Sequence, residues 1–428
     1  MFIKIKSKFQ SREKKTLLSN FFSLFVLQGA NFILPLISLP YLVRVLGIEK
    51  FGLVMFAQAF IIYFIVIVDY GFNLSATRDI SIHRKDREKL SLIFSTVMLI
   101  KIILIFFSLL LLSFIVFSFE KFEVNWELYY LTFGMVIGQA LFPIWFFQGV
   151  EKMKYIAILN IIAKLIFTIL IFFVIQSPKD YLYVPLLNSL GFIVVGLLSL
   201  YIIFSKFQMK IIIPTFSYIK KTFVGSSSLF VSNVSVTLYT ASNTFILGLF
   251  TNNATVGIYA SIEKLVLAVK NLYTPLYQAL FPWLSKKSIT EAKVKILKLV
   301  VPITFFSSFV TLIVYIFAKD LLTLIFNQVE ITEYYVVFQI MAFISIFSSL
   351  NMLFNMLYLT AIKAYKERMI IMISTGIFNI CIVFILTKYY SLYGTAMAII
   401  LTEILLLIFG IYFFNKDVNI YWSEKFEK

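Results

Sequence analysis

Charged residues are scarce in this sequence, and their scarcity limits its class. Only 14% of the 428 residues are charged and 61% are hydrophobic, whereas roughly a quarter of a soluble globular protein is charged. Cysteine and histidine occur once each, as Cys381 and His83. This excludes an intrachain disulfide and argues against a zinc site, a haem site or a Cys–His nucleophile. No GxxxxGK[ST] loop is present, so no ATP hydrolysis is built into this chain. We expect no cofactor, no metal and no enzymatic activity.

Long apolar runs are what the chain has instead. A packed soluble core could not bury this much apolar surface, so lipid must solvate much of it. Runs of about 20 residues, enough to cross a bilayer, recur from end to end and predict an all-α polytopic membrane protein. We expect about twelve transmembrane helices, near residues 17–43, 51–74, 90–118, 127–148, 155–176, 181–204, 222–250, 255–284, 296–318, 332–359, 367–387 and 391–414.

Basic residues are distributed unequally between the two sides of these spans. With the N-terminus placed in the cytoplasm, 28 Lys and Arg fall on the cytoplasmic side, six outside and four within spans. This asymmetry predicts that both termini lie in the cytoplasm and supports an even number of spans. It also explains the net charge of +17 without a nucleic-acid partner. The external connections are too short for a catalytic domain outside the membrane.

Two short sequence matches indicate an internal repeat. Phe51–Gln58 resembles Val256–Glu263, and Gly149–Lys154 resembles Ala361–Lys366. Six spans plus six that start on the same side form a parallel repeat, which is typical of transporters. We therefore predict two six-helix lobes, with an N-terminal lobe at 1–204, a cytoplasmic linker at 205–221, a C-terminal lobe at 222–414 and a cytoplasmic tail at 415–428.

Charges within the spans are the candidate functional residues, because each costs at least ~2.5–3.5 kcal/mol near the bilayer centre. The functional interpretation is a cationic cavity for an anionic head group such as a diphosphate, since lysine binds phosphate as a point charge. The alternatives are snorkelling at helix ends, an interfacial anchor in the case of Arg44, or lysine–carboxylate pairs that hold helices together. The candidate cationic residues are Arg44, Lys101, Lys164, Lys264 and Lys270.

Acidic residues in or near the spans suggest gating or ion coupling. Glu403 and Asp69 are candidate proton or cation sites, and the alternative is a satisfied structural carboxylate. Asp69 and Arg78 bracket a charged loop, and one hypothesis is that they pair as a gate. Glu263 shares a helix face with Lys270 but lies two turns away from it. It could therefore reach that lysine only through a bent geometry or a water molecule.

Polar side chains form one stripe on the first predicted helix of each half. Gln28 and Asn31 share a face with Pro35 and Ser38, and Asn233 and Thr237 share one with Thr240 and Thr244. We expect these stripes to line a cavity that binds sugar hydroxyls. The alternative is helix packing, with Ser and Thr bonding across helices.

Three segments carry a family resemblance. They are Asn31–Gly47 (NFILPLISLPYLVRVLG), Phe51–Gln58 together with Asp69–Arg78 (FGLVMFAQ and DYGFNLSATR), and Pro143–Met153 (PIWFFQGVEKM). These resemble the Wzx-type O-antigen flippases of the MOP superfamily, which also contains the MATE drug exporters. The resemblance is specific over about the first 165 residues, and the second half matches mainly in topology.

The resemblance implies two lobes around a cationic cavity, alternating access, and an undecaprenyl-diphosphate-linked oligosaccharide as cargo. It also implies a place in the bacterial plasma (inner) membrane. Membrane lipids, and a polymerase and chain-length regulator of the same pathway, are the implied partners. The alternatives are a multidrug or cation antiporter, whose cavity should be acidic, and a polysaccharide polymerase, which generally needs a large external loop. A lipid II flippase of the MurJ type would have an extra pair of helices.

Overall fold

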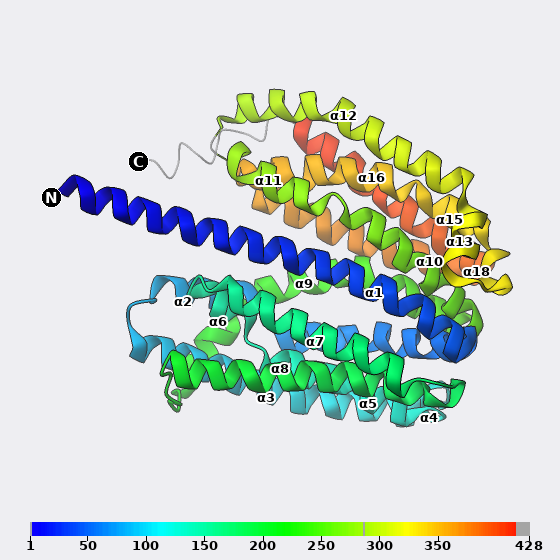
Figure 1. The fold of residues 1–428 in the computed structure, drawn as a ribbon, viewed down its shortest axis with the longest axis horizontal. Coiled ribbons are helices and arrows are strands. Elements are labelled where there is room, and N and C mark those ends of the chain that lie inside the picture. Colours follow the sequence, from blue (N-terminus) through cyan, green and yellow to red (C-terminus); the bar gives the residue numbers. More distant parts are fainter. Residues whose placement is uncertain (1, 286, 417–428) are drawn as a thin grey trace. The chain divides into compact units, whose positions relative to one another are not determined.

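The computed structural model describes residues 2–285 and 287–416, with side chains described from Leu34 onward except at 239, 275, 278, 279 and 282. Throughout this part of the chain the regular elements are helices (Figure 1), which confirms the predicted all-α fold. The first half contains α1 (Phe2–Asp69), α2 (Phe72–Ile82), α3 (Arg87–Ser118), α4 (Glu120–Glu123), α5 (Trp126–Leu141), α6 (Ile144–Gly149), α7 (Met153–Val174), the 3-10 helix η1 (Pro178–Leu182) and α8 (Tyr183–Lys206).

The second half continues with helices of more varied length. They are α9 (Phe216–Phe250), α10 (Asn253–Asn271), α11 (Thr274–Leu284), α12 (Ile289–Ile316), α13 (Ala318–Phe326), α14 (Val329–Thr332), α15 (Tyr335–Ala342), α16 (Ile344–Asn351), the π-helix η2 (Met352–Tyr358), α17 (Leu359–Ala361) and α18 (Tyr365–Asn415). Side chains at the starts of several helices satisfy free backbone N–H groups. Asp86, Asn252 and Ser288 each accept a bond from the N–H three residues on, at 3.1, 2.9 and 3.3 Å.

Eight described segments are long and apolar enough to cross a membrane, and two of them are double. α1 is interrupted at Gly47 (φ 73°, ψ 163°) and α18 at Ser391 (φ 50°, ψ −130°). Counting these halves separately, and adding α9 and the α10–α11 pair, accounts for the twelve segments predicted. The eight segments are Leu34–Ile82, Arg87–Ser118, Trp126–Gly149, Met153–Val174, Pro178–Lys206, Ile289–Ile316, Tyr335–Ala361 and Tyr365–Asn415.

The outward faces of these helices are apolar, as a lipid environment requires. On α3, Phe106, Phe107 and Phe114 are 64%, 56% and 68% exposed. On α12, Val301 and Phe305 are 74% and 76% exposed. Apolar surface of this extent would aggregate in water, so the chain is a multi-pass membrane protein.

The chain divides into two compact units. Unit 1 comprises residues 1–46 and 60–234, and unit 2 comprises residues 47–59 and 235–428. The division falls within α9 rather than in the predicted linker at 205–221, and a short piece after Gly47 belongs to unit 2. Unit 1 has its core around Trp145 and Phe146, and unit 2 has a separate core around Leu353 and Leu357.

The middle of the predicted linker, residues 207–215, is non-helical and is held against α3. The Ser91 hydroxyl accepts a bond from the Lys210 N–H at 3.1 Å, and the Ser95 hydroxyl accepts one from the Ile212 N–H at 3.0 Å. Ser95 also donates to the Lys210 carbonyl oxygen at 3.4 Å. These bonds satisfy backbone groups that have no helical partner, so the segment is part of unit 1.

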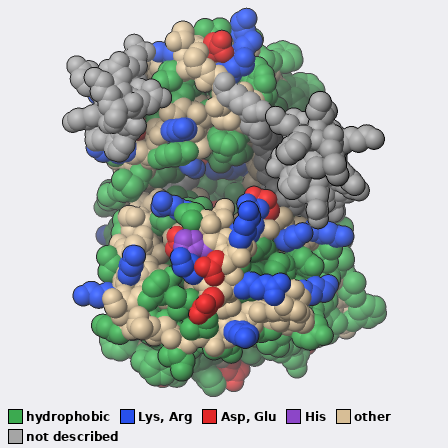
Figure 2. Space-filling view, turned by 90° about the vertical axis from the view of Figure 1, so that its left-hand side faces the viewer, with side chains coloured by type: hydrophobic (Ala, Val, Ile, Leu, Met, Phe, Trp, Pro, Cys, Tyr) green, Lys and Arg blue, Asp and Glu red, His purple; other side chains and the backbone are tan. Residues whose placement is uncertain are grey.

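Basic side chains gather on the face of unit 1 that Figure 2 shows. An ion pair of 2.5 Å between Arg84 and Glu151 joins the connection between α2 and α3 to the connection between α6 and α7. Both side chains are about half exposed, so this pair adds little stability. The exposed basic residues of the two connections are Arg78, Arg84, Lys85, Arg87, Lys89, Lys152 and Lys154.

One of the predicted repeat matches has the same backbone conformation in both halves. Glu151 (φ 58°) and Lys363 (φ 61°) occupy equivalent positions of the match and are both left-handed. In each case the next N–H bonds a carbonyl five residues back, from Lys152 to Phe147 and from Ala364 to Leu359, both at 2.8 Å. This is a helix-ending Schellman turn, and its recurrence supports the internal repeat.

Close packing of α5 on α8 makes a direct test of the unit 1 fold. A Cβ on Gly138 would lie 2.6 Å from the Phe192 Cβ and 2.7 Å from the Ile193 nitrogen. Gly138→Ala should therefore force α5 and α8 apart and cost about 1–3 kcal/mol, measured as a lower thermal unfolding temperature of the purified protein. Gly225→Ala is the control, since its Cβ would meet nothing within 4 Å. Equal stability of the two variants would contradict this packing.

Candidate functional site

A buried ion pair joins α3 to the end of α1 in unit 1. The Lys101 Nζ lies 3.3 Å from the Asp69 Oδ1, with side-chain exposures of 4% and 19%. Asp69 is the last residue of α1, and Tyr70 (φ 47°) and Gly71 (φ 79°) turn the chain into α2. A Cβ on Gly71 would lie 2.8 Å from the Leu229 Cβ, so glycine suits both the turn and the contact.

The position of Asp69 is fixed by its neighbours. The Tyr70 ring stacks on Phe223 and Phe230 with centroids 4.1 and 4.7 Å apart. Asp69 therefore meets Lys101, whereas Arg78, the residue proposed to pair with it as a gate, is exposed on α2. Lys101 was predicted to bind an anionic cargo, and in this structure a carboxylate of the protein itself is its counterion.

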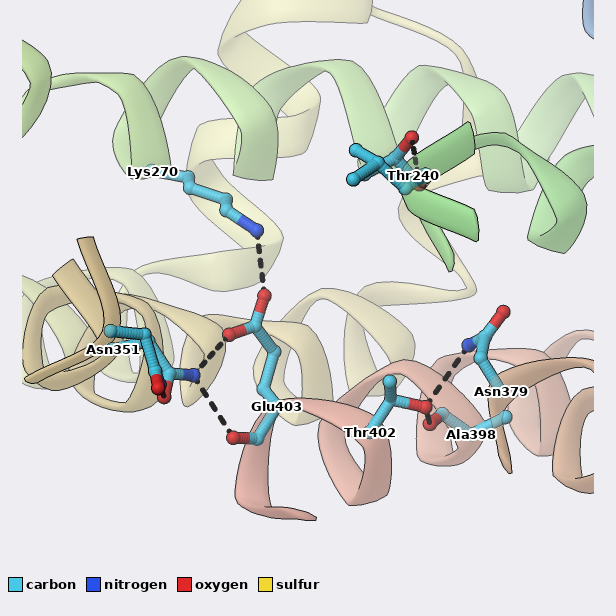
Figure 3. A network of polar contacts seen from close by, with 9 residues as sticks. Thr240, Lys270, Asn351, Asn379, Ala398, Thr402 and Glu403 are labelled. Carbon is cyan, nitrogen blue, oxygen red and sulfur yellow. Dashed lines mark hydrogen bonds and ion pairs between the residues drawn. The ribbon is translucent and has the colours of Figure 1, made fainter. Parts of the chain in front are cut away.

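A second ion pair lies in unit 2, between α10 and the second half of α18. The Lys270 Nζ lies 2.6 Å from the Glu403 Oε1 (Figure 3). Glu403 is only 1% exposed, whereas Lys270 is 29% exposed. The spacing argument considered Glu263 as a partner of Lys270, but the structure places Glu403 there.

One asparagine, Asn351, binds the Glu403 carboxylate, and a second, Asn355, binds Asn351 in turn. The Asn351 Nδ2 donates to the Glu403 Oε2 at 2.6 Å and to the Glu403 carbonyl oxygen at 3.0 Å. The Asn355 Nδ2 donates to the Asn351 Oδ1 at 3.1 Å and to the Leu406 carbonyl at 3.0 Å. Glu403 is thus held by Asn351 as well as by Lys270, and it is the more deeply buried member of the ion pair.

The backbone around the asparagines is adapted to them. Asn355 lies in the π-helix η2, a rare form that is frequent at functional sites. A Cβ on Gly410 would lie 2.6 Å from the Asn355 Nδ2, so Gly410 makes room for the amide. The Asn355 Oδ1 is buried and has no partner among the described residues.

A second polar cluster is built around Thr402, the residue before Glu403 in α18 (Figure 3). The Asn379 Nδ2 donates to the Thr402 hydroxyl at 3.0 Å and to the Asn243 Oδ1 at 3.4 Å. The Thr402 hydroxyl donates to the Ala398 carbonyl at 2.8 Å. Asn243, Asn379 and Thr402 are 0% exposed, so this cluster ties α9 to both halves of α18.

The sequence analysis did not single out these amides as site residues. Asn351 and Asn355 are four residues apart, which places both on one helix face within the apolar run 332–359. Buried amides in lipid need partners, so that spacing was a usable signal. Asn243 lies beside Thr244 of the predicted polar stripe and Asn379 lies four residues after Thr375, but spacing along the chain did not bring the two amides together.

The remaining acidic candidate binds a hydroxyl. Glu263 is partly buried, and its Oε2 accepts a bond from the Thr244 hydroxyl at 2.8 Å. Thr244 belongs to the polar stripe predicted for the first helix of the second half. The structure thus connects that stripe to α10 by side-chain bonding across helices.

The other predicted residues are not members of the two ion pairs. Arg44 and Lys264 are exposed, and Lys164, Asn233 and Thr237 are partly buried. Gln28 and Asn31 lie outside the residues whose side chains are described. Within the described residues, no group of three or more His, Cys, Asp or Glu is placed to hold a metal ion.

The ion pair of Asp69 with Lys101 should contribute strongly to the stability of the protein. Removing one partner of a buried pair leaves an uncompensated charge and costs about 3–5 kcal/mol. Asp69→Asn should therefore lower the free energy of unfolding strongly, because Lys101 is nearly inaccessible, and Lys101→Met added to Asp69→Asn should recover most of the loss. Lys319→Ala, at an exposed lysine of α13, is the control in the same unfolding measurement. An Asp69→Asn protein as stable as the wild type would contradict the pair.

Comparison with known proteins places the chain in a family. Residues 17–288 match the family model described as polysaccharide biosynthesis protein. A protein of Escherichia coli (strain K12) named "Putative O-antigen transporter" is 27% identical over 399 residues, covering 92% of this chain and 95% of its own. Its namesake in Shigella dysenteriae is 28% identical over 392 residues, covering 91% and 98%.

Solved structures share the fold at low sequence identity. An inward-facing multidrug resistance MATE family transporter of the MOP superfamily has a TM-score of 0.70 at 13% identity, covering 90% of this chain and 96% of its own. The lipid II flippase MurJ, in an inward closed conformation, has a TM-score of 0.69 at 14% identity, covering 92% and 87%. These likenesses confirm the predicted MATE-like fold. The family match covers more than half of the sequence and confirms the resemblance seen in its motifs: the chain belongs to the polysaccharide biosynthesis protein family.

Proposed function

We propose that this protein is a flippase for lipid-linked oligosaccharides. In this proposal it moves undecaprenyl-diphosphate-linked repeat units from the cytoplasmic to the outer leaflet of the plasma membrane, for O-antigen or a related surface polysaccharide. The observation that carries the proposal is the family match, together with two relatives named as O-antigen transporters that align over more than 90% of both chains.

Lys270 is the residue we assign first to the anionic head group. Its ammonium is partly exposed and already bound to an oxyanion, the Glu403 carboxylate at 2.6 Å. A phosphate oxygen offers lysine the same kind of charge-assisted hydrogen bond. A diphosphate can therefore compete with Glu403 for Lys270, while Asn351 continues to hold the carboxylate. The equivalent exchange at Lys101 is harder, because both partners there are largely buried.

The other cationic candidates remain part of the proposal. Lys101, Lys164, Lys264 and Arg44 are proposed as further contacts of the head group, and Asn233 and Thr237 as contacts of its sugars. Coupling to a proton or cation gradient through Asp69, Arg78, Glu263 or Glu403 likewise remains a prediction.

We also propose how the protein works and how it is oriented. Alternating access would occur by movement of the two units, and the division of the chain into two compact units supports it. The excess of Lys and Arg on one side of the spans supports cytoplasmic termini. Contacts with a polymerase and a chain-length regulator of the same pathway remain predictions.

The alternative is a multidrug or cation antiporter, because MATE exporters share this fold. A site for cations should present carboxylates without cationic partners. Here Asp69 and Glu403 each have a lysine as counterion, which favours an anionic cargo.

The function can be tested in a strain that lacks this protein but retains the rest of its polysaccharide pathway. We expect lipid-linked repeat units to accumulate on the cytoplasmic leaflet, and re-expression to clear them. Mass spectrometry of the extracted lipid measures the accumulation and identifies the sugars. Complete but unpolymerised units on the outer leaflet would instead indicate a polymerase, and unchanged lipids with altered drug resistance would indicate an exporter.

The site can be tested in the same strain by complementation. Lys270→Ala should leave the protein in the membrane but weaken clearance of the lipid, because the head group loses its cationic contact. Lys270→Arg keeps the charge and should retain part of the activity, and Lys319→Ala is the exposed-lysine control. Wild-type clearance by Lys270→Ala would remove Lys270 from the binding site.

A further inference from the structure

One helix of this protein is shared by the two units. The second half of α1 runs from Ile48 to Asp69. Its first part, as far as Ala59, belongs to unit 2, and the rest, from Phe60, belongs to unit 1. Any movement of one unit against the other must therefore bend this helix, detach its first turns from unit 2 or detach its last turns from unit 1.

The first turns of this helix cross α10 at a pair of glycines. A Cβ on Gly52 would lie 1.8 Å from the Asn253 carbonyl oxygen and 2.6 Å from the Gly257 nitrogen. A Cβ on Gly257 would lie 2.2 Å from the Ile48 carbonyl oxygen. The two backbones are thus in direct contact, and no larger residue fits at either position. We call this contact of Ile48, Gly52, Asn253 and Gly257 the glycine crossing.

The glycine crossing is reciprocal and follows the internal repeat. In the sequence match of Phe51–Gln58 with Val256–Glu263, Gly52 corresponds to Gly257, and the same offset relates Ile48 to Asn253. Each glycine faces the carbonyl oxygen that lies four residues before the other. The two copies of the repeat therefore meet here through equivalent atoms, as across a two-fold axis.

An aromatic contact lies one turn beyond the glycine crossing. The Phe56 ring stacks on Phe245 with centroids 5.5 Å apart and an interplanar angle of 8°. A Cβ on Gly248 would lie 2.2 Å from the Phe56 Cδ2. Glycine thus makes a flat surface for this ring as well, and Phe56 is 1% exposed.

The composition of the shared helix favours detachment over bending. Sharp helix kinks occur at Pro, at Gly or Ser pairs, at π-bulges or where a side chain or water enters the hydrogen-bond ladder. After Gly52, the sequence through Asp69 contains no Gly, Pro or Ser. At the glycine crossing, by contrast, backbone lies on backbone without interlocked side chains, and the contacts there are weak individually.

We infer that the glycine crossing is a gate contact: it is closed in this structure and separates once in each transport cycle. The inference rests on the proposed function, because only a cycle of alternating access requires the units to move. Glycine at positions 52 and 257 lets the gate close without a cavity, and it lets the gate open without separating an ion pair.

Thiol labelling tests whether the contact opens. In a Cys381→Ala background, Phe56→Cys should react with N-ethylmaleimide in membranes, although residue 56 is buried in the closed form. Gly257→Ala should accelerate this labelling, because the added Cβ disfavours closure, whereas Gly225→Ala should not. Phe133→Cys, at a phenylalanine of unit 1 that is 2% exposed, is the matched control and should stay unlabelled. Labelling at residue 56 that is as slow as at residue 133, and unaffected by Gly257→Ala, would overturn the inference.

Cross-linking tests whether opening is needed for transport. A short, reducible thiol cross-linker that joins Phe56→Cys to Phe245→Cys should cause loss of lipid clearance, and reduction should restore it. Phe60→Cys with Phe122→Cys, whose rings in unit 1 are 5.0 Å apart, is the control pair and should tolerate the link. Transport by the protein that is cross-linked between residues 56 and 245 would overturn the inference. If no cross-link forms, the labelling rates of the preceding experiment decide whether the contact opens.

The two proposals can fail separately. Labelling does not depend on the cargo. If the glycine crossing opens in a protein that clears no lipid, the flippase proposal is wrong and the gate proposal stands. If a protein whose glycine crossing stays closed still clears the lipid, the gate proposal is wrong and the flippase proposal stands.

Discussion

In a membrane, a buried ammonium or carboxylate must find its counterion within the protein, and the rest of this structure is arranged around that requirement. Lys101 meets Asp69 within unit 1, and Lys270 meets Glu403 within unit 2. Each pair joins helices that are distant in sequence, because 32 and 133 residues separate the partners. Since leaving either charge unpaired in lipid is expensive, each pair fixes which helices are neighbours within its unit.

The class of this protein was predictable because it depends on properties that add along the chain. Apolar runs report the length of a span, and the distribution of Lys and Arg reports the side of each connection, so the all-α membrane fold followed without any knowledge of contacts. The identities of the charged residues within the spans were also predictable, since a charge stands out in an apolar run. Their pairing was not. Helical spacing reports only neighbours on the same helix, so for Lys270 it could consider only Glu263, which lies two turns away, whereas the actual partner lies on α18.

The amides beneath Glu403 show a further limit of sequence reasoning. Asn351 and Asn355 are uncharged, so their cost in lipid is smaller and their presence in an apolar run is less conspicuous than that of a lysine. Yet they decide what the Glu403–Lys270 pair can do. A carboxylate that keeps the Asn351 amide as a donor remains hydrogen-bonded when its lysine turns to another anion. Without the amide, the same exchange would leave a bare charge in the core of unit 2.

Two kinds of contact therefore have different mechanical consequences in this molecule. An ion pair in an apolar medium is costly to separate, and each described pair lies within one unit, where a movement of units would leave it intact. A contact between glycine backbones creates no unpaired charge when it separates, and it closes again without rearranging side chains. The shared helix from Ile48 to Asp69 carries both kinds: Gly52 lies near its start, and Asp69, held by Lys101, is at its end. On these energetics, the end bearing Asp69 should stay with unit 1, and the end bearing Gly52 is the one that can release.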